Sequence, residues 1–211
     1  MTQPVWVPIT VSSESSGSLE LFVLSDAWRT PEGYRGMYTA LTQQKLADSM
    51  HASLLTQKLA DEIYLQSKHK LRPVTLSSGP EMMTESHAIE HSRQLDAQLK
   101  DLNAHPNDLV SNVGKHWILA ERLVKLPNKA VNYGWYMSHV RKVISTPRNL
   151  TGIQGPTAGH FRGHFDYSQT ARLVSLECSL NGQTHHLHEI ADNPNTRHLI
   201  TYEPTMNFKR Y

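Results

Sequence analysis

The chain has 211 residues, of which 38% are hydrophobic and 19% are charged, with a formal net charge of +2. This length can bury the core of one domain. The near-neutral charge gives no reason to expect binding to nucleic acid, and no apolar run is long enough to cross a membrane. The N-terminal residues lack the basic and apolar regions of a signal peptide, so we expect a cytoplasmic protein encoded by a bacterium or a phage.

The first elements expected along the chain are two strands, Val5 to Val11 and Leu19 to Leu24, joined by a serine-rich turn. Two similar stretches follow, LTQQKLAD from Leu41 and LTQKLAD from Leu55. Thr42 and Thr56 are suitable N-caps before good helix formers, so each stretch predicts a short helix.

The helix-rich part of the chain continues to residue 102. Residues 72–83 contain two prolines and a glycine and are expected to form a connection. A solvated helix is expected from Thr84 to Leu102, with Thr84 beginning a partial capping box and a thin apolar stripe facing the core.

The remaining residues, 109–211, favour strands. KAVNYGWY predicts a strand with Val131, Tyr133 and Trp135 on one face. Residues 149–161 contain glycines and a proline and are expected to form a loop, with a strand beginning at Phe165. Asn181-Gly182 predicts the centre of a type I′ hairpin turn.

These elements together predict a single α+β domain over residues 1–211, helix-rich at 40–102 and strand-rich at 109–211. We expect a mostly antiparallel sheet in the C-terminal half, with the N-terminal helices packed on it. The hairpin should place Cys178 on its first strand and His186 on its second. His186 could face Cys178 across the hairpin and act as the base that a catalytic thiolate needs. Cysteines in strands are usually small buried apolar groups, however, so we expect Cys178 to be structural.

The stretch GHFRGHFDYSQTARLV, Gly159 to Val174, carries the strongest candidate for a site. A strand from Phe165 would put Asp166, Ser168 and Arg172 on one face, and His160 could fold back over it. Histidine, aspartate and serine are the components of acid–base or nucleophilic catalysis, and arginine holds anions. The alternative is a polar strand face with an Asp–Arg ion pair and no chemistry.

Further residues could line such a site. Lys115 and His116, in GKHWIL, could place a cation near His160, or could be two ordinary solvent-facing residues before an apolar run. The aromatic stretch NYGWY offers Tyr133 and Trp135 as walls of a substrate pocket, although such side chains more often belong to a core.

A metal site is the other chemistry to weigh. Five residues separate His160 from Asp166 in the sequence. The segment HHLHE would place His186 and His188 on one face of a strand. The spacing matches no standard zinc pattern, and HExxH is absent from the sequence. We therefore expect no tightly bound zinc and no cofactor.

The segments LLTQKLADEIY and AVNYGWY, and the order GH followed by DYSQTARLV, together resemble a bacterial and phage protein family for which no activity is established. The resemblance extends from about Phe22 onward. Its pattern has His-Gly after the DYS serine, where this chain has Gln169-Thr170. The resemblance implies the following candidate site residues: Tyr133, Gly134, Trp135, His160, Asp166, Tyr167, Ser168 and Arg172.

A weaker similarity is to the L,D-transpeptidase signature, in which a cysteine lies between the serine and the arginine. SQTAR keeps Ser168 and Arg172 without that cysteine, so thiolate acyl transfer is excluded. The similarity still suggests cell-wall peptide as a substrate.

The sequence leads to two hypotheses. The first is a hydrolase of amide or ester bonds, acting on a peptide or other small substrate, with His160 as general base, Asp166 as its partner and Ser168 as nucleophile or oxyanion donor. Its substrate-binding residues would be Arg172, Lys115, Tyr133, Trp135 and Tyr167. The second is a non-catalytic binding or structural protein, such as a phage virion or assembly component.

Overall fold

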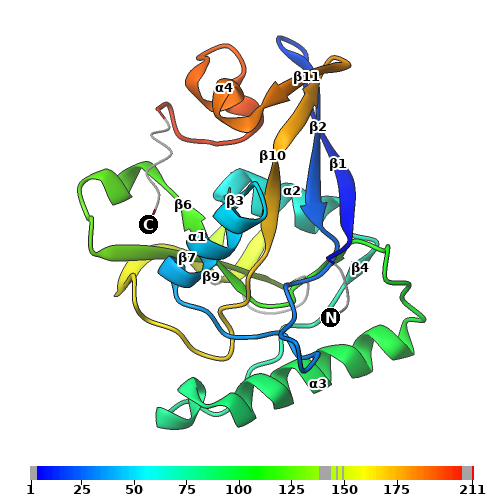
Figure 1. The fold of residues 1–211 in the computed structure, drawn as a ribbon, viewed down its shortest axis with the longest axis vertical. Helices are drawn as coiled ribbons and strands as arrows, with labels where there is room; N and C mark the ends of the chain where they lie inside the picture. Colours follow the sequence, from blue (N-terminus) through cyan, green and yellow to red (C-terminus); the bar gives the residue numbers. More distant parts are fainter. Residues whose placement is uncertain (1–3, 138–143, 146, 149, 206–210) are drawn as a thin grey trace.

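The computed structural model describes residues 4–137, 144–145, 147–148, 150–205 and 211. Within these residues the chain forms an α+β fold built on a nine-stranded, mostly antiparallel sheet, with a separate two-stranded sheet beside it (Figure 1). The nine strands are β1 (Trp6–Ser13), β2 (Gly17–Leu24), β3 (Ala52–Thr56), β6 (Lys115–Leu119), β7 (Lys129–Tyr136), β8 (Ile144–Ser145), β9 (Thr151–Phe161), β10 (Leu173–Leu180) and β11 (Gln183–His186).

The sheet combines strands from both ends of the chain. Its order is β1-β2-β10-β3-β6-β7-β9-β8, and β11 pairs with the far end of β10. Only β3 and β6 are parallel within it. The expected confinement of the sheet to the C-terminal half is therefore wrong, because the hairpin β1–β2 and the strand β3 supply three of its members. The small sheet pairs β4 (His69–Lys70) with β5 (Val110–Ser111).

The two helices predicted from the repeated LTQ stretches cover opposite faces of this sheet. Helix α1 (Ala40–Ser49) packs with Leu54, Leu119 and Leu173 on one face. Helix α2 (Gln57–Gln66) packs on the other face, in the large core that contains Val131 and Val174. Packing on both faces of the sheet explains why β3, β6 and β7 are buried along almost their whole length.

Helix caps follow the sequence closely. Thr56 accepts a hydrogen bond from the Leu59 amide and begins α2, as predicted. Thr39 is the cap of α1, so the expected cap Thr42 lies inside the helix. Thr84 begins α3 (Glu85–Asp101), also as predicted. In Figure 1, α3 crosses one end of the molecule, and the short helix α4 (Leu187–Asp192) lies at the opposite end.

The hairpin prediction at Asn181-Gly182 is confirmed. Both residues have positive φ, 52° and 82°, and they join β10 to β11 with Leu180 opposite Gln183. Cys178 lies on the first strand and is buried, opposite His185. His186 ends the second strand and caps α4, so it pairs with Glu177 and does not face the thiol.

Two expectations in the C-terminal half are wrong. Residues 151–161 form β9, a long strand paired with β7 near the rim of the sheet, where glycine and proline are tolerated. Strand β10 begins at Leu173 and not at Phe165, so residues 162–172 form the connection between β9 and β10. His160 therefore precedes the loop that carries Asp166, the reverse of the predicted order.

Candidate active site

The candidate site lies on the face of the sheet that α1 covers, beyond the end of that helix. Lys115 and Trp117 are on the same side of β6 because side chains alternate along a strand. His160 belongs to this side too, since it pairs with Ala130 of β7, which packs against Trp117. The rings of Trp117 and His160 are 5.9 Å apart and nearly perpendicular.

A bulge in β7 brings Trp135 to the same side. Gly134 and Trp135 both have positive φ, 127° and 58°, which interrupts the alternation of the strand. Tyr133 and Tyr136 consequently both belong to the core on the α2 side of the sheet. Trp135 packs with Tyr167 on the side of the candidate site. The prediction that Tyr133 and Trp135 share a face is therefore wrong. The ammonium of Lys115 lies 5.0 Å from the centre of the Trp135 ring.

The loop between β9 and β10 supplies the acidic group. It is attached to β6 by a hydrogen bond of 2.6 Å from the Lys115 amide to the Ser168 carbonyl. Within the loop, both the amide and the hydroxyl of Ser168 donate to Oδ1 of Asp166. The amide of Asp166 in turn donates to the side chain of Gln169. These contacts fix the Asp166 carboxylate close to Lys115.

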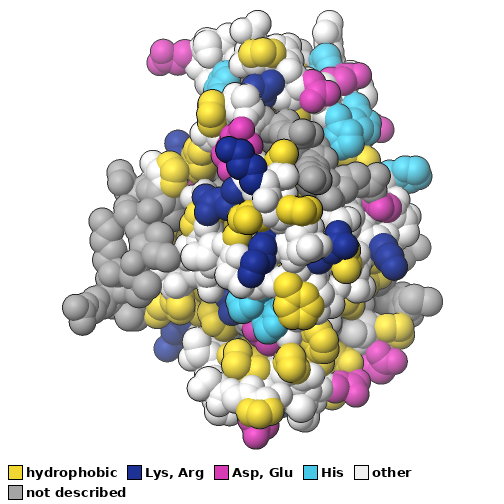
Figure 2. Space-filling model, turned by 90° about the vertical axis from the view of Figure 1, so that its left-hand side faces the viewer, with side chains coloured by type: hydrophobic (Ala, Val, Ile, Leu, Met, Phe, Trp, Pro, Cys, Tyr) yellow, Lys and Arg dark blue, Asp and Glu magenta, His cyan; other side chains and the backbone are white. Residues whose placement is uncertain are grey.

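Two histidines stand beside this carboxylate. The rings of His160 and His164 are stacked, with centroids 4.1 Å apart and planes 11° from parallel. Nε2 of His164 lies 3.5 Å from Oδ2 of Asp166. Both rings are partly exposed. Figure 2 views the molecule from the left of Figure 1, and on this face histidine side chains reach the surface among apolar and basic groups.

The electrostatics of the cluster favour an ionised Lys115–Asp166 pair with a neutral His160 beside it. Burial lowers the pKa of Lys115, and Asp166 opposes this shift. Burial alone would raise the pKa of Asp166, but Lys115 and the hydrogen bonds from Ser168 and Gln169 outweigh it, and the pKa is lowered. Burial, with repulsion from His164 and Lys115, lowers the pKa of His160. A neutral His160 therefore stands near a charged lysine.

Several predicted site residues are placed where they cannot meet a substrate directly. Ser168 has no exposed surface, and its hydroxyl is bonded to Asp166. Arg172 is 1% exposed, and it lies with Asp166 in the connection before β10, so the two residues share no strand face. Tyr133 is 1% exposed and donates to Asp61 on the opposite face of the sheet. All three side chains are therefore closed off from solvent in this structure, and the roles expected for them stay predictions.

Tyr167 is also buried, but it stays next to the site. Its hydroxyl accepts a hydrogen bond of 2.8 Å from the Leu76 amide. Its ring packs against Trp135, at 6.5 Å between centroids. Tyr167 and Trp135 thus form the inner wall of the cluster, behind Lys115.

Sequence reasoning missed two histidines. His164 is not among the site residues predicted from the sequence, yet it is the histidine in contact with Asp166. His91 of α3 is fully buried beside Tyr167 and Trp135, and burial lowers its pKa to about 3. The helical spacing of Ala88, His91 and Leu95 could have revealed this buried position, because i, i+3 and i+7 share a face.

The other histidine-rich segment does not form the strand face expected for a metal site. His186 caps α4 and His188 lies within that helix. Among the described residues, no group of three or more histidine, cysteine, aspartate or glutamate side chains is arranged to hold a metal ion. The expectation of no bound zinc stays a prediction, to be checked by elemental analysis of the protein purified without a histidine tag.

Comparisons with protein-family models, with curated proteins and with solved structures each return no match. The functional argument therefore rests on the geometry of the chain itself. In the parts of the chain described above, no helix combines the length and the apolar character needed to span a bilayer.

Proposed function

We propose that the protein is a hydrolase of amide or ester bonds, acting on peptide substrates such as cell-wall peptide. The observation that carries this proposal is the environment of Lys115. Its side chain is 9% exposed, and its ammonium donates no hydrogen bond to any described residue, although Asp166 and His160 are its electrostatic neighbours. A nearly buried lysine with free donors is suited to stabilising an anion that forms during a reaction.

In the proposed hydrolysis, His160 and Lys115 have different roles. His160, held neutral by its lowered pKa, takes a proton from a water molecule that attacks the substrate carbonyl. Lys115 stabilises the oxyanion of the resulting tetrahedral intermediate. His160 then returns the proton to the departing nitrogen or oxygen as the bond to carbon breaks. Water is the nucleophile in this scheme because the Ser168 hydroxyl is bonded to Asp166.

Asp166 and His164 are positioning residues. The Asp166 carboxylate keeps Lys115 protonated against the effect of burial. It also stabilises the imidazolium that His160 becomes during the reaction, since its charge raises the pKa of that ring. His164 stacks on His160 and fixes the orientation of its ring.

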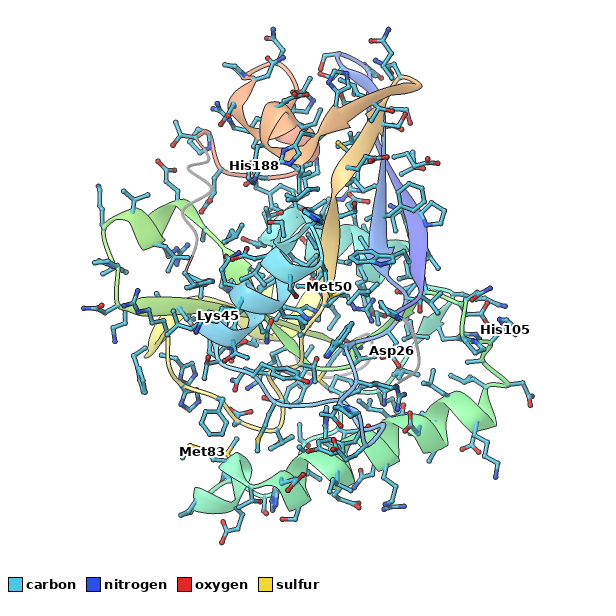
Figure 3. All side chains as sticks on the ribbon, viewed as in Figure 1. Asp26, Lys45, Met50, Met83, His105 and His188 are labelled. Carbon is cyan, nitrogen blue, oxygen red and sulfur yellow. The ribbon has the colours of Figure 1, made fainter. Side chains whose placement is uncertain are left out.

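The test is hydrolysis of p-nitrophenyl acetate and of purified peptidoglycan fragments by the wild type and two variants. We expect His160→Ala and Lys115→Met each to lower kcat by about 10² to 10⁴, the usual contribution of such groups. Lys45→Met is the matched control, because Lys45 is an exposed residue of α1 (Figure 3). Melting temperatures should show that all three variants fold.

The pH profile gives a second readout. The rate should rise as His160 loses its proton, at a pH below the ordinary imidazole value, and fall as Lys115 loses its proton, at a pH below the ordinary lysine value. Both limbs of the bell are thus displaced towards acid. Binding of cell-wall peptide without turnover in the wild type would contradict the proposal and favour the non-catalytic alternative.

A further inference from the structure

Arg172 is the residue whose environment remains unexplained by the proposed reaction. It immediately precedes β10 and is 1% exposed. Its Nε, Nη1 and Nη2 atoms are all buried, and none has a hydrogen-bond acceptor among the residues that the structure describes. Arginine is almost never fully buried without a partner, because desolvating an unpaired charge is very costly.

The carboxylate that acts on Arg172, that of Asp26, is already occupied by two other arginines. Oδ2 of Asp26 accepts from Arg35 at 2.5 Å and from Arg29 at 3.1 Å, and its Oδ1 accepts from Nε of Arg35 at 2.8 Å. Asp96 accepts from the same two arginines. Three guanidinium groups thus share two carboxylates, which leaves one positive charge in excess, and the group without an ion pair in the described residues is that of Arg172.

Loss of a proton does not remove this charge. Burial, with repulsion from Arg35, lowers the pKa of Arg172 to about 10, so it is still protonated at neutral pH. His116 beside it is neutral, since burial and Arg172 lower its pKa to about 3. The excess charge therefore needs a counter-charge from outside the chain.

We propose that Arg172 binds a small monovalent anion of the size of chloride in the interior of the fold. A guanidinium offers five N–H donors, and an anion would accept from those that the protein leaves unbonded. A single negative charge balances the excess. A dianion such as sulfate would overcompensate it and would need donors beyond this one sealed side chain. This site is separate from the proposed catalytic cluster.

The first experiment measures thermal unfolding in sodium chloride and in sodium gluconate at equal ionic strength. A ligand that binds only the folded state multiplies the folding equilibrium constant by one plus its concentration over Kd, so a 100-fold excess over Kd should raise it about 100-fold. We expect the melting temperature of the wild type to rise with chloride and to saturate, with gluconate giving no such rise.

Two variants identify the site. Arg172→Met removes the charge while keeping length and apolar stem, and its melting temperature should be the same in both salts. Arg93→Met is the matched control, because Arg93 forms an exposed ion pair with Glu90 on α3, and it should keep the full response to chloride. In gluconate, Arg172→Met should be at least as stable as the wild type, since it buries no unpaired charge.

The second experiment does not depend on any variant folding. Crystals of the wild type grown in sodium bromide should show one buried anomalous bromide peak within hydrogen-bond distance of the Arg172 guanidinium. Equal melting temperatures of the wild type in chloride and gluconate would overturn the proposal. So would a water molecule at Arg172 in place of bromide.

Discussion

At the scale of single residues, buried hydroxyls do more than fill space. The hydroxyl of Tyr211 accepts a hydrogen bond of 3.0 Å from the Val131 amide and donates one of 2.7 Å to the Ile118 carbonyl. Ile118 and Val131 are directly opposite on β6 and β7. The tyrosine therefore bridges two strands through one oxygen, and its ring packs on the adjoining apolar clusters.

This bridge predicts the effect of a single-atom change. Tyr211→Phe should lower the free energy of unfolding by about 1–3 kcal/mol, because it leaves an amide and a carbonyl without a partner in a buried place. The measurement is urea unfolding followed by circular dichroism. Tyr34→Phe is the control, since the Tyr34 hydroxyl bonds to Glu85 at the surface. Equal losses in the two variants would mean that the bridge contributes nothing specific.

At the scale of elements, a comparison of two glycines, Gly182 and Gly159, distinguishes the effect of backbone strain from the effect of packing. Gly182 in the β10–β11 turn has φ of 82°, and an added Cβ would meet no atom within 4 Å. Gly159 in β9 likewise has open space around its Cβ position, but its φ is not positive. The two sites thus differ in backbone conformation and not in room.

We therefore expect Gly182→Ala to destabilise the fold by about 1 kcal/mol, the cost of a left-handed conformation for an L-residue. Gly159→Ala should be neutral or slightly stabilising, because alanine restricts the unfolded chain more than glycine does. Thermal unfolding of the two variants side by side measures the difference. A loss in Gly159→Ala as large as in Gly182→Ala would argue against the assigned turn.

The elements also show where sequence patterns succeed. The caps Thr56 and Thr84 and the turn Asn181-Gly182 are local signals, set by hydrogen bonds or φ values within a few residues. Strand β3 has no such signal: it is five residues long, fully buried, and lies between helices α1 and α2. Its strand conformation comes from pairing with β10 and β6, which the local sequence does not encode.

The same distinction applies to the candidate site. His160 and Asp166 could be predicted as site residues because they belong to a stretch of the sequence, Gly159 to Val174, that is rich in polar groups. Lys115 could be predicted as a possible cation near them. The contact of His164 with Asp166 depends on where the loop turns, and the position of Trp135 depends on the bulge at Gly134. A bulge shifts every following side chain to the other face, so alternation counted along β7 gives the wrong side for Trp135.

At the scale of the whole molecule, an ionic network joins α3 to the sheet. Arg35, with no exposed surface, bonds to Asp26, two residues beyond the end of β2, and to Asp96 of α3. Figure 3 labels Asp26 in the space between the sheet and that helix. Apolar packing of Leu95 with Val110 and Val113 supports the same junction.

This network predicts the response of the protein to acid. Burial alone would raise the pKa of Asp26, but Arg35 and Arg29 outweigh it and lower the pKa to about 2. A lowered folded-state pKa stabilises the fold above the unfolded value, and the gain is lost as pH falls from about 4 to about 2. Asp26 should thus contribute roughly 2 kcal/mol at neutral pH.

Asp26→Asn should lose this stability at pH 7 and become less sensitive to acid in that window. Urea unfolding at several pH values between 7 and 2 measures both effects. Glu14→Gln is the control, since Glu14 is exposed in the β1–β2 turn. A wild-type acid response that Asp26→Asn leaves unchanged would place the sensitive carboxylates elsewhere.

The position of β10 between β2 and β3 has a consequence for synthesis on the ribosome. Val23 pairs with Val174, roughly 150 residues later in the chain. At about 5–20 residues per second, the β1–β2 hairpin emerges some 8 to 30 s before its neighbour exists. The strand that completes the burial of Leu19, Leu21 and Val23, all fully buried in the folded protein, is missing throughout that interval. The nascent hairpin is therefore the segment that a ribosome-associated chaperone would have most reason to hold.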